Sequence, residues 1–125
     1  EATSKSSTCF RAYHQENGSN GTLAYYTAGD RANSTSAQYL SVEASNENDH
    51  GVSGTFTLFN PSNTTFVKHF ISSSNAVYND TSDYTMNFYV AGYFNTTSAI
   101  NGIRFRFNTG NMDSGTIKLY GIKDS

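Results

Sequence analysis

The chain has 125 residues, a formal net charge of −2 and a single cysteine. This length suits one compact domain, and the lack of a basic excess excludes the clustered Lys and Arg that bind a nucleic-acid backbone. One cysteine excludes an intrachain disulfide framework, and no apolar run reaches the roughly 18 residues of a membrane-spanning helix. Nine Phe, nine Tyr and a charged fraction of only 14% favour a β-sheet protein over a helical or disordered one.

Short segments with alternating polar and apolar residues occur along the whole chain and predict an all-β fold, an antiparallel jelly roll or sandwich of about eight strands. In chain order, the expected strands are residues 9–14, 22–27, 37–44, 54–59, 65–71, 84–94, 103–107 and 115–122. Ser72–Asn75 is expected to form a turn, and Gly92 to mark a β-bulge. The chain contains no linker or change in composition, so residues 1–125 are interpreted as a single domain.

The last two expected strands form the densest apolar stretch of the chain. Residues 108–114 between them are rich in turn formers, which predicts an antiparallel hairpin. Each buried Phe or Leu contributes about 1.5–3 kcal/mol, so we expect deletion of this pair to unfold the domain.

Catalysis would need titratable side chains at a suitable spacing, and the sequence offers few. The histidines His14, His50 and His69 are scattered. Carboxylates gather in residues 43–49, a pattern that would suit glycoside hydrolysis, but a loop rich in Ser and Asn favours plain solvation. Calcium bound by the oxygen ligands of residues 46–49 stays open. We otherwise expect no catalytic residue, cofactor or metal.

Two further features bear on chemical modification. Cys9 lies in an alternating stretch beside Phe10, which favours a buried structural thiol over a reactive one. Six Asn-x-Ser/Thr sequons begin at Asn17, Asn20, Asn33, Asn63, Asn79 and Asn95. Several sequons arise by chance in a chain this rich in Asn, Ser and Thr, so their glycosylation stays open.

Exposed Tyr, Asn, Asp and Arg side chains are the remaining candidates for contact with a ligand or partner. Tyrosine combines apolar area with a hydroxyl and can stack on sugars or anchor a protein, although packing between strands is its more frequent role. The candidate contact residues are Tyr25, Tyr26, Asn48, Asp49, Tyr93, Arg104 and Arg106.

The C-terminal stretch carries a specific pattern. Ala-Ile-x-x-Ile-Arg-Phe at 99–105 is followed by Thr-Gly-Asn at 109–111 and Ser-Gly-Thr-Ile-Lys-Leu-Tyr-Gly at 114–121. With the Leu-Phe-Asn-Pro turn at 58–61, it resembles the end of a jelly-roll module of tailed-bacteriophage virion proteins, over residues 50–123. Such modules usually begin with further strands that are absent here, so the resemblance implies the C-terminal part of a longer virion protein.

The resemblance implies a non-enzymatic structural domain on the virion surface, either in an appendage fibre or spike or as capsid decoration. It further implies assembly with copies of itself, a trimer by family analogy, and contacts with other virion proteins. Attachment to a host cell-surface glycan would agree with the loop-tip Asn, Asp and Tyr residues. We expect neither nucleic-acid binding nor membrane insertion.

Three alternatives come from other functional classes. A carbohydrate-binding module of a secreted enzyme would show a coplanar row of Tyr rings on one face. A polysaccharide depolymerase would use carboxylates such as Glu43 and Glu47. A capsid-cementing protein would have no receptor at all, and composition does not separate it from an adhesion domain.

Overall fold

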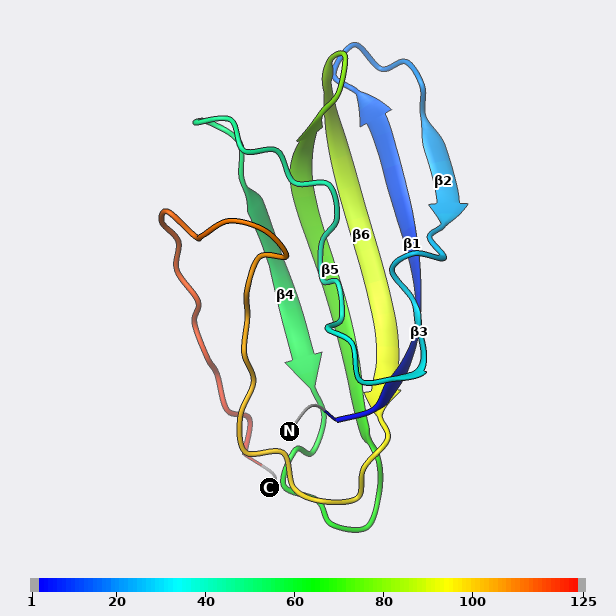
Figure 1. The fold of residues 1–125 in the computed structure, drawn as a ribbon, viewed down its shortest axis with the longest axis vertical. Coiled ribbons are helices and arrows are strands. Elements are labelled where there is room, and N and C mark those ends of the chain that lie inside the picture. The colour runs from blue at the N-terminus through cyan, green and yellow to red at the C-terminus, as the bar shows by residue number, and fades with distance from the viewer. Residues whose placement is uncertain (1–2, 124–125) are drawn as a thin grey trace.

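In the computed structural model, which describes residues 3–123, the chain forms one antiparallel sheet of six strands and no helix. The strands are β1 (Lys5–Gln15), β2 (Thr22–Tyr25), β3 (Arg31–Ser34), β4 (Val52–Leu58), β5 (Lys68–Asn79) and β6 (Asp83–Phe94). Their order across the sheet is β2-β1-β6-β5-β4, and β3 pairs with the N-terminal end of β1 (Figure 1). The all-β prediction is confirmed, whereas a second sheet is not formed by the described residues. Residues 3–123 contain no helix long and apolar enough to cross a membrane.

The long strands β1, β6 and β5 occupy the centre of the sheet. Along β5, every second residue from 68 to 76 is buried and the residues between them are exposed. The turn predicted at Ser72–Asn75 is wrong, because β4 and β6 pair with this stretch on both sides and keep it extended. The buried Ser72 hydroxyl donates to the Thr55 carbonyl at 2.8 Å, so a polar residue fits inside the strand.

The hydrophobic core lies on one face of the sheet, here called the inner face. Its buried residues are Cys9, Val42, Phe70, Met86, Phe88 and Val90. The segment 35–51 crosses this face and supplies Val42, while Tyr39 and Leu40 pack against the cluster (Figure 1). The strand predicted at 37–44 is wrong, because the segment runs over the sheet face instead of along an edge with free hydrogen-bonding groups.

Cys9 confirms the prediction of a buried structural thiol. It is 1% exposed, and its Sγ atom donates a hydrogen bond to the Tyr26 carbonyl at 3.1 Å. Burial raises the pKa of the Cys9 thiol, and the negative charge of Asp30 adds to the rise. The thiol therefore keeps its proton, and with it this hydrogen bond.

Gly92 does not mark a bulge, because the register between β1 and β6 continues through it without a shift. A Cβ atom at this position would lie 2.2 Å from the Ser6 carbonyl oxygen and 2.7 Å from the Ser7 Cβ atom. The glycine is thus required for close approach of the two strand backbones.

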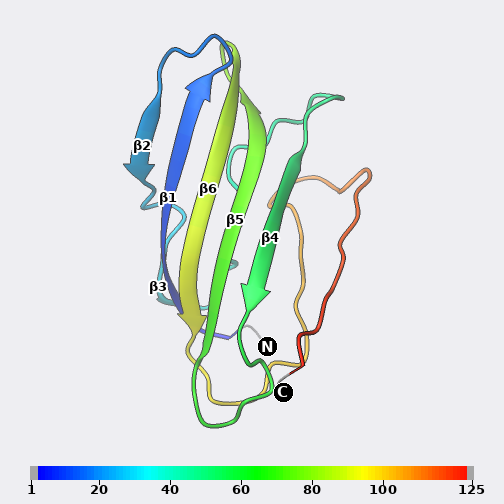
Figure 2. The ribbon, with the colours of Figure 1, turned by 180° about the vertical axis from the view of Figure 1, so that it is seen from behind.

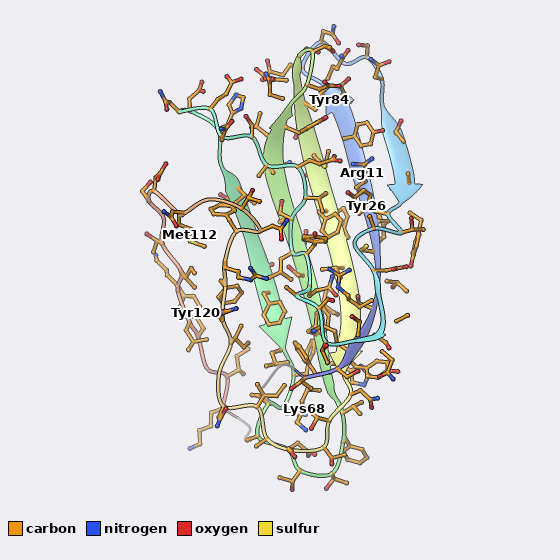
Figure 3. All side chains as sticks on the ribbon, viewed as in Figure 1. Arg11, Tyr26, Lys68, Tyr84, Met112 and Tyr120 are labelled. Carbon is orange, nitrogen blue, oxygen red and sulfur yellow. The ribbon has the colours of Figure 1, made fainter. Side chains whose placement is uncertain are left out.

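Two lysines are buried at one end of the inner face, and both lie opposite Phe94 in the register of β6. Lys68 lies at the end of the sheet near the loops that follow β4 and β6 (Figure 3). Its ammonium donates to two backbone carbonyls at 2.7 and 3.2 Å. The Lys5 ammonium donates to two others at 3.3 and 2.6 Å. Burial, together with the nearby Arg31 guanidinium, lowers the pKa of Lys5. These bonds fasten the neighbouring loops to the sheet.

The C-terminal segment, defined as residues 101–123, contains no strand, so the strands predicted at 103–107 and 115–122 are wrong for this structure. It runs near β4 in both views (Figures 1 and 2). The Phe105 ring packs edge-on against Phe56 of β4, with 6.2 Å between ring centroids. This contact is made between side chains over the inner face, so it forms no backbone hydrogen bonds with β4. Strand β4 therefore remains an edge strand.

Candidate functional site: two exposed surfaces

The outer face of the sheet, opposite the core, is crossed by none of the described segments (Figure 2). A row of aromatic side chains lies across it, because Tyr25, Phe10 and Tyr89 are register partners in β2, β1 and β6. The Phe10 and Tyr89 rings stack with 4.9 Å between centroids and 20° between planes. Tyr25 is 53% exposed and Phe10 is 45% exposed, so this aromatic row is open to solvent.

Apart from Asp83 at the first position of β6, the outer face is also uncharged along its three central strands. Alternation and register place these residues on it: Ser6, Thr8, Phe10, Ala12 and His14 of β1, Thr85, Asn87, Tyr89, Ala91 and Tyr93 of β6, and His69, Ile71, Ser73, Asn75 and Val77 of β5. No Lys, Arg, Asp or Glu occurs among them. Such a face suits an electrically neutral partner, because charged groups would gain no ion pair there.

A shallow hollow of about 440 Å³ lies beside the aromatic row, between β4, β5 and β6. Its lining includes Asn75 and Asn87, together with Ser53, Thr55 and Ser73. The Asn75 amide donates to the Asn87 side-chain oxygen at 2.6 Å, and the Asn87 amide donates to the Tyr89 hydroxyl at 3.1 Å. The hollow therefore presents neutral, prearranged polar groups.

The C-terminal segment is the second exposed surface. Its apolar side chains alternate as in a half-buried strand, yet Ile103 is 47%, Ile117 is 64% and Leu119 is 95% exposed. Met112 and Tyr120 lie on the part of this segment that is farthest from the central strands (Figure 3). A concentration of exposed apolar side chains of this kind marks an interaction surface.

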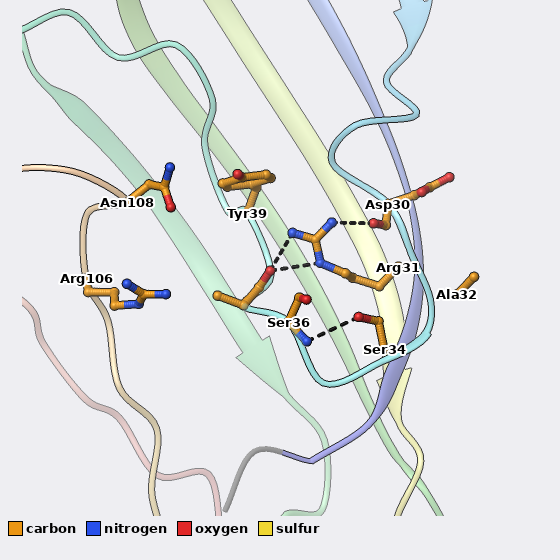
Figure 4. Close-up of a pocket in the computed structure, with 9 residues that line it drawn as sticks. Asp30, Arg31, Ala32, Ser34, Ser36, Tyr39, Arg106 and Asn108 are labelled. Atoms are coloured by element: carbon orange, nitrogen blue, oxygen red, sulfur yellow. Dashed lines mark hydrogen bonds between the residues drawn. The ribbon is translucent and has the colours of Figure 1, made fainter.

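A second hollow, of about 560 Å³, separates residues 30–39 from the C-terminal segment (Figure 4). Arg31 and Arg106 line it from opposite sides. The Arg31 guanidinium donates to the carbonyl of Ala37 at 2.5 and 2.8 Å and lies 5.0 Å from the Tyr39 ring centroid. Most donors of Arg31 are thus engaged within the chain, which leaves Arg106 as the freer cation of the pair.

Tyr26 belongs to the packing of the inner face. Its ring meets Phe88 edge-on at 6.0 Å, and the Arg11 guanidinium lies 4.6 Å from the ring centroid. Arg11 also forms an ion pair with Glu43. Burial, followed by the charge of Glu43, raises the pKa of Tyr26. Glu43 is therefore tied to a structural arginine, and Glu47 lies in a separate exposed loop.

The structure does not bring the predicted contact residues together. Tyr25 and Tyr93 share the outer face, where Tyr93 neighbours His69 at 6.0 Å between centroids. Asn48 and Asp49 lie in the exposed loop before β4. Arg104 and Arg106 both belong to the C-terminal segment.

Sequence reasoning missed Phe10 and Tyr89 as surface residues. Each sits in an alternating strand, a pattern that cannot say whether a face is covered. Only the register across the sheet shows that the two rings are neighbours.

No protein-family model matches the chain, and no curated protein or solved structure matches it either.

Proposed function

We propose that this chain is a non-enzymatic structural domain of a bacteriophage virion that assembles with copies of itself through its C-terminal segment. The observation that carries the proposal is the exposure of Ile103, Ile117 and Leu119 in stretches with the alternation of a strand. An apolar row with this period is normally half-buried in a sheet. A neighbouring copy would bury this apolar row, and burial of apolar area would stabilise the assembly.

The backbone of the same segment supports pairing between copies. Within the described residues, no backbone hydrogen bond joins residues 101–123 to a strand. Strand β4 (Val52–Leu58) is likewise paired on only one side, with β5. Addition of a strand to such an edge satisfies both backbones at once. In this proposal, the second sheet of a sandwich or jelly roll is completed between copies.

The virion surface as location follows from the resemblance of residues 50–123 to phage jelly-roll modules. The low charge and the dense cover of Ser, Thr and Asn agree with a domain that meets varied salt outside a cell. In the proposal, copies of the domain assemble on an appendage or the capsid and contact other virion proteins.

Analytical ultracentrifugation of the chain over a dilution series tests self-assembly. We expect a concentration-dependent oligomer for the wild type and a monomer for Leu119→Ser and Ile117→Ser. Leu23→Ser is the matched control, because Leu23 is a 71% exposed aliphatic residue on the opposite edge strand, β2. A wild type that stays monomeric throughout would overturn the assembly proposal. Immunogold labelling of purified virions tests the location, and unlabelled particles would contradict it.

A carbohydrate-binding module is the second candidate, and the neutral hollow beside Asn75 and Asn87 favours it. The aromatic row is a weaker argument, because Phe10 and Tyr89 stack on each other and are not coplanar. A sugar would therefore bind through the amides more than through ring faces. Glycan-array binding that is lost in Asn87→Leu and kept in Leu119→Ser would support this function. Absence of binding to every glycan would remove it.

A further inference from the structure

The loop between the inner-face crossing and β4 holds a compact group of possible metal ligands. One ligand atom each from Glu47, Asp49 and His50 lies within 4.8 Å of the others. The group is formed by a tight turn in which the His50 backbone N–H donates to the Glu47 carbonyl at 3.1 Å. Carboxylates alone are common on surface loops, so the evidence for a metal site comes from the His50 imidazole.

His50 is buried, points into this group and lacks a hydrogen-bond partner. Its side chain is only 8% exposed. Its Nε2 atom lies 3.7 Å from the Asp49 Oδ1 atom and 3.8 Å from the Asp83 Oδ2 atom, which is too long for a hydrogen bond. Its Nδ1 atom is buried without any hydrogen bond. The imidazole thus has no hydrogen bond at either nitrogen, which is costly for a buried polar group.

The backbone holds these ligands in place. The loop is fastened to β5 at both ends, since the Ser45 N–H donates to the Val77 carbonyl at 3.0 Å and the Val77 N–H donates to the Gly51 carbonyl at 3.3 Å. Asp83 begins β6, and its second carboxylate oxygen accepts a hydrogen bond from the Asn79 amide at 2.7 Å. The imidazole and the Asp83 carboxylate therefore face each other from anchored elements.

Negative charge accumulates at this place without a Lys or Arg side chain to balance it. Among residues 3–123, neither Glu47, Asp49 nor Asp83 forms an ion pair with Lys or Arg. A divalent cation would neutralise the carboxylates and bind the His50 Nε2 atom, which faces Asp49 and Asp83. Imidazole binds first-row transition metals, whereas calcium prefers oxygen ligands only.

We propose that Glu47, Asp49 and His50 bind a divalent transition-metal ion, Zn²⁺ above all, with Asp83 as an adjacent carboxylate that adds negative charge. The site goes beyond the assembly role and differs from the sequence expectation, which assigned no metal and left only calcium open at residues 46–49. The ion would fasten the loop before β4 to the start of β6.

Isothermal titration of the untagged, metal-free chain with Zn²⁺, Mn²⁺ and Ca²⁺ tests the site. We expect one Zn²⁺ per chain, bound more tightly than Ca²⁺, and affinity at least tenfold weaker in His50→Gln. Asp83→Asn should weaken binding less. His69→Gln is the matched control, since His69 is an exposed histidine on the outer face and should keep full affinity.

A second readout does not depend on heat of binding. Because a ligand that binds only the folded chain stabilises it, saturating Zn²⁺ should raise the Tm of the wild type and of His69→Gln clearly more than that of His50→Gln. Circular dichroism confirms that each variant is folded. Equal Zn²⁺ affinity in the wild type and His50→Gln, or tighter binding of Ca²⁺ than of Zn²⁺, would overturn the proposal.

Discussion

Strands β5 and β6 and the C-terminal segment share the same alternation of polar and apolar residues but differ in burial. Phe88 of β6 is 0% exposed, whereas Leu119 of the C-terminal segment is 95% exposed. Both regions have the composition of strands, so local propensity does not explain the difference. What separates them is pairing, because β5 and β6 have hydrogen-bonded neighbours on both sides and the C-terminal segment has none within the described residues.

A segment with the alternation of a strand therefore needs a neighbouring strand to pair with its backbone and bury its apolar side chains. For β5 and β6, the neighbouring strands belong to the same chain, and their apolar side chains are buried in the core. In the C-terminal segment the requirement stays unmet within one chain. We infer that the C-terminal segment pairs with another copy of the chain.

The largest effect is expected at the centre of the core. Phe88→Ala removes a fully buried ring that packs edge-on against Tyr26, so the free energy of unfolding should fall by about 3–5 kcal/mol. Urea denaturation followed by circular dichroism measures the loss. A change below 1 kcal/mol, on the scale of ordinary surface substitutions, would mean that the inner face is not the core.

A smaller loss is expected where β1 and β6 approach most closely. Gly92→Val places side-chain atoms against the Ser6 carbonyl and should cost about 1–3 kcal/mol by overpacking. Gly102→Val is the matched control in the C-terminal segment, because no atom lies within 4 Å of a Cβ at Gly102. Equal losses of unfolding free energy in Gly92→Val and Gly102→Val would contradict the close packing of β1 against β6.

Burial of the Cys9 thiol should make the free energy of unfolding depend on pH. The folded-state pKa of Cys9 is raised by burial, so the folded chain keeps its proton at a pH where the unfolded chain releases it, around 9.0. Its contribution to the free energy of unfolding is complete below that pH and is lost as the pH rises through the folded pKa. Cys9→Ala should therefore lose less stability than the wild type between about pH 7 and about pH 10. Parallel pH curves would refute the assignment.

The smallest effect is expected in the monomer at Leu119. Leu119→Ser should change the free energy of unfolding by less than about 0.5 kcal/mol, because the side chain is exposed. Denaturation at a concentration below that of assembly measures it. This outcome contrasts with the sequence expectation that the last two strands hold the domain together, and a loss of several kcal/mol would restore that expectation.

The sequence predicted the all-β class, the two faces of β6 and the burial of Cys9, because alternation with period two reports a half-buried strand directly. It missed the extended stretch at Ser72–Asn75, where pairing on both sides overrides the turn preference of Ser and Asn. It also placed strands at 37–44 and 103–107, where the pattern is real but neither segment pairs with a strand of the sheet.

The candidate surfaces were less accessible to sequence reasoning. Tyr25 and Tyr93 were predicted as contact residues, but their neighbours Phe10 and His69 follow only from the register. The group around His50 was likewise out of reach, since Asp83 lies far from it in sequence and the burial of the imidazole depends on tertiary packing. Local pattern therefore predicted strands, and pairing between strands decided the sites.

Hydrogen exchange of the dilute, monomeric chain tests the central contrast most directly. We predict strong protection of backbone amides in 70–77 and 86–93, and nearly unprotected exchange in 103–107 and 115–122, because only the first two stretches are paired in the sheet. Strong protection of both C-terminal stretches in the monomer would contradict the account, since it would place them in a sheet within one chain.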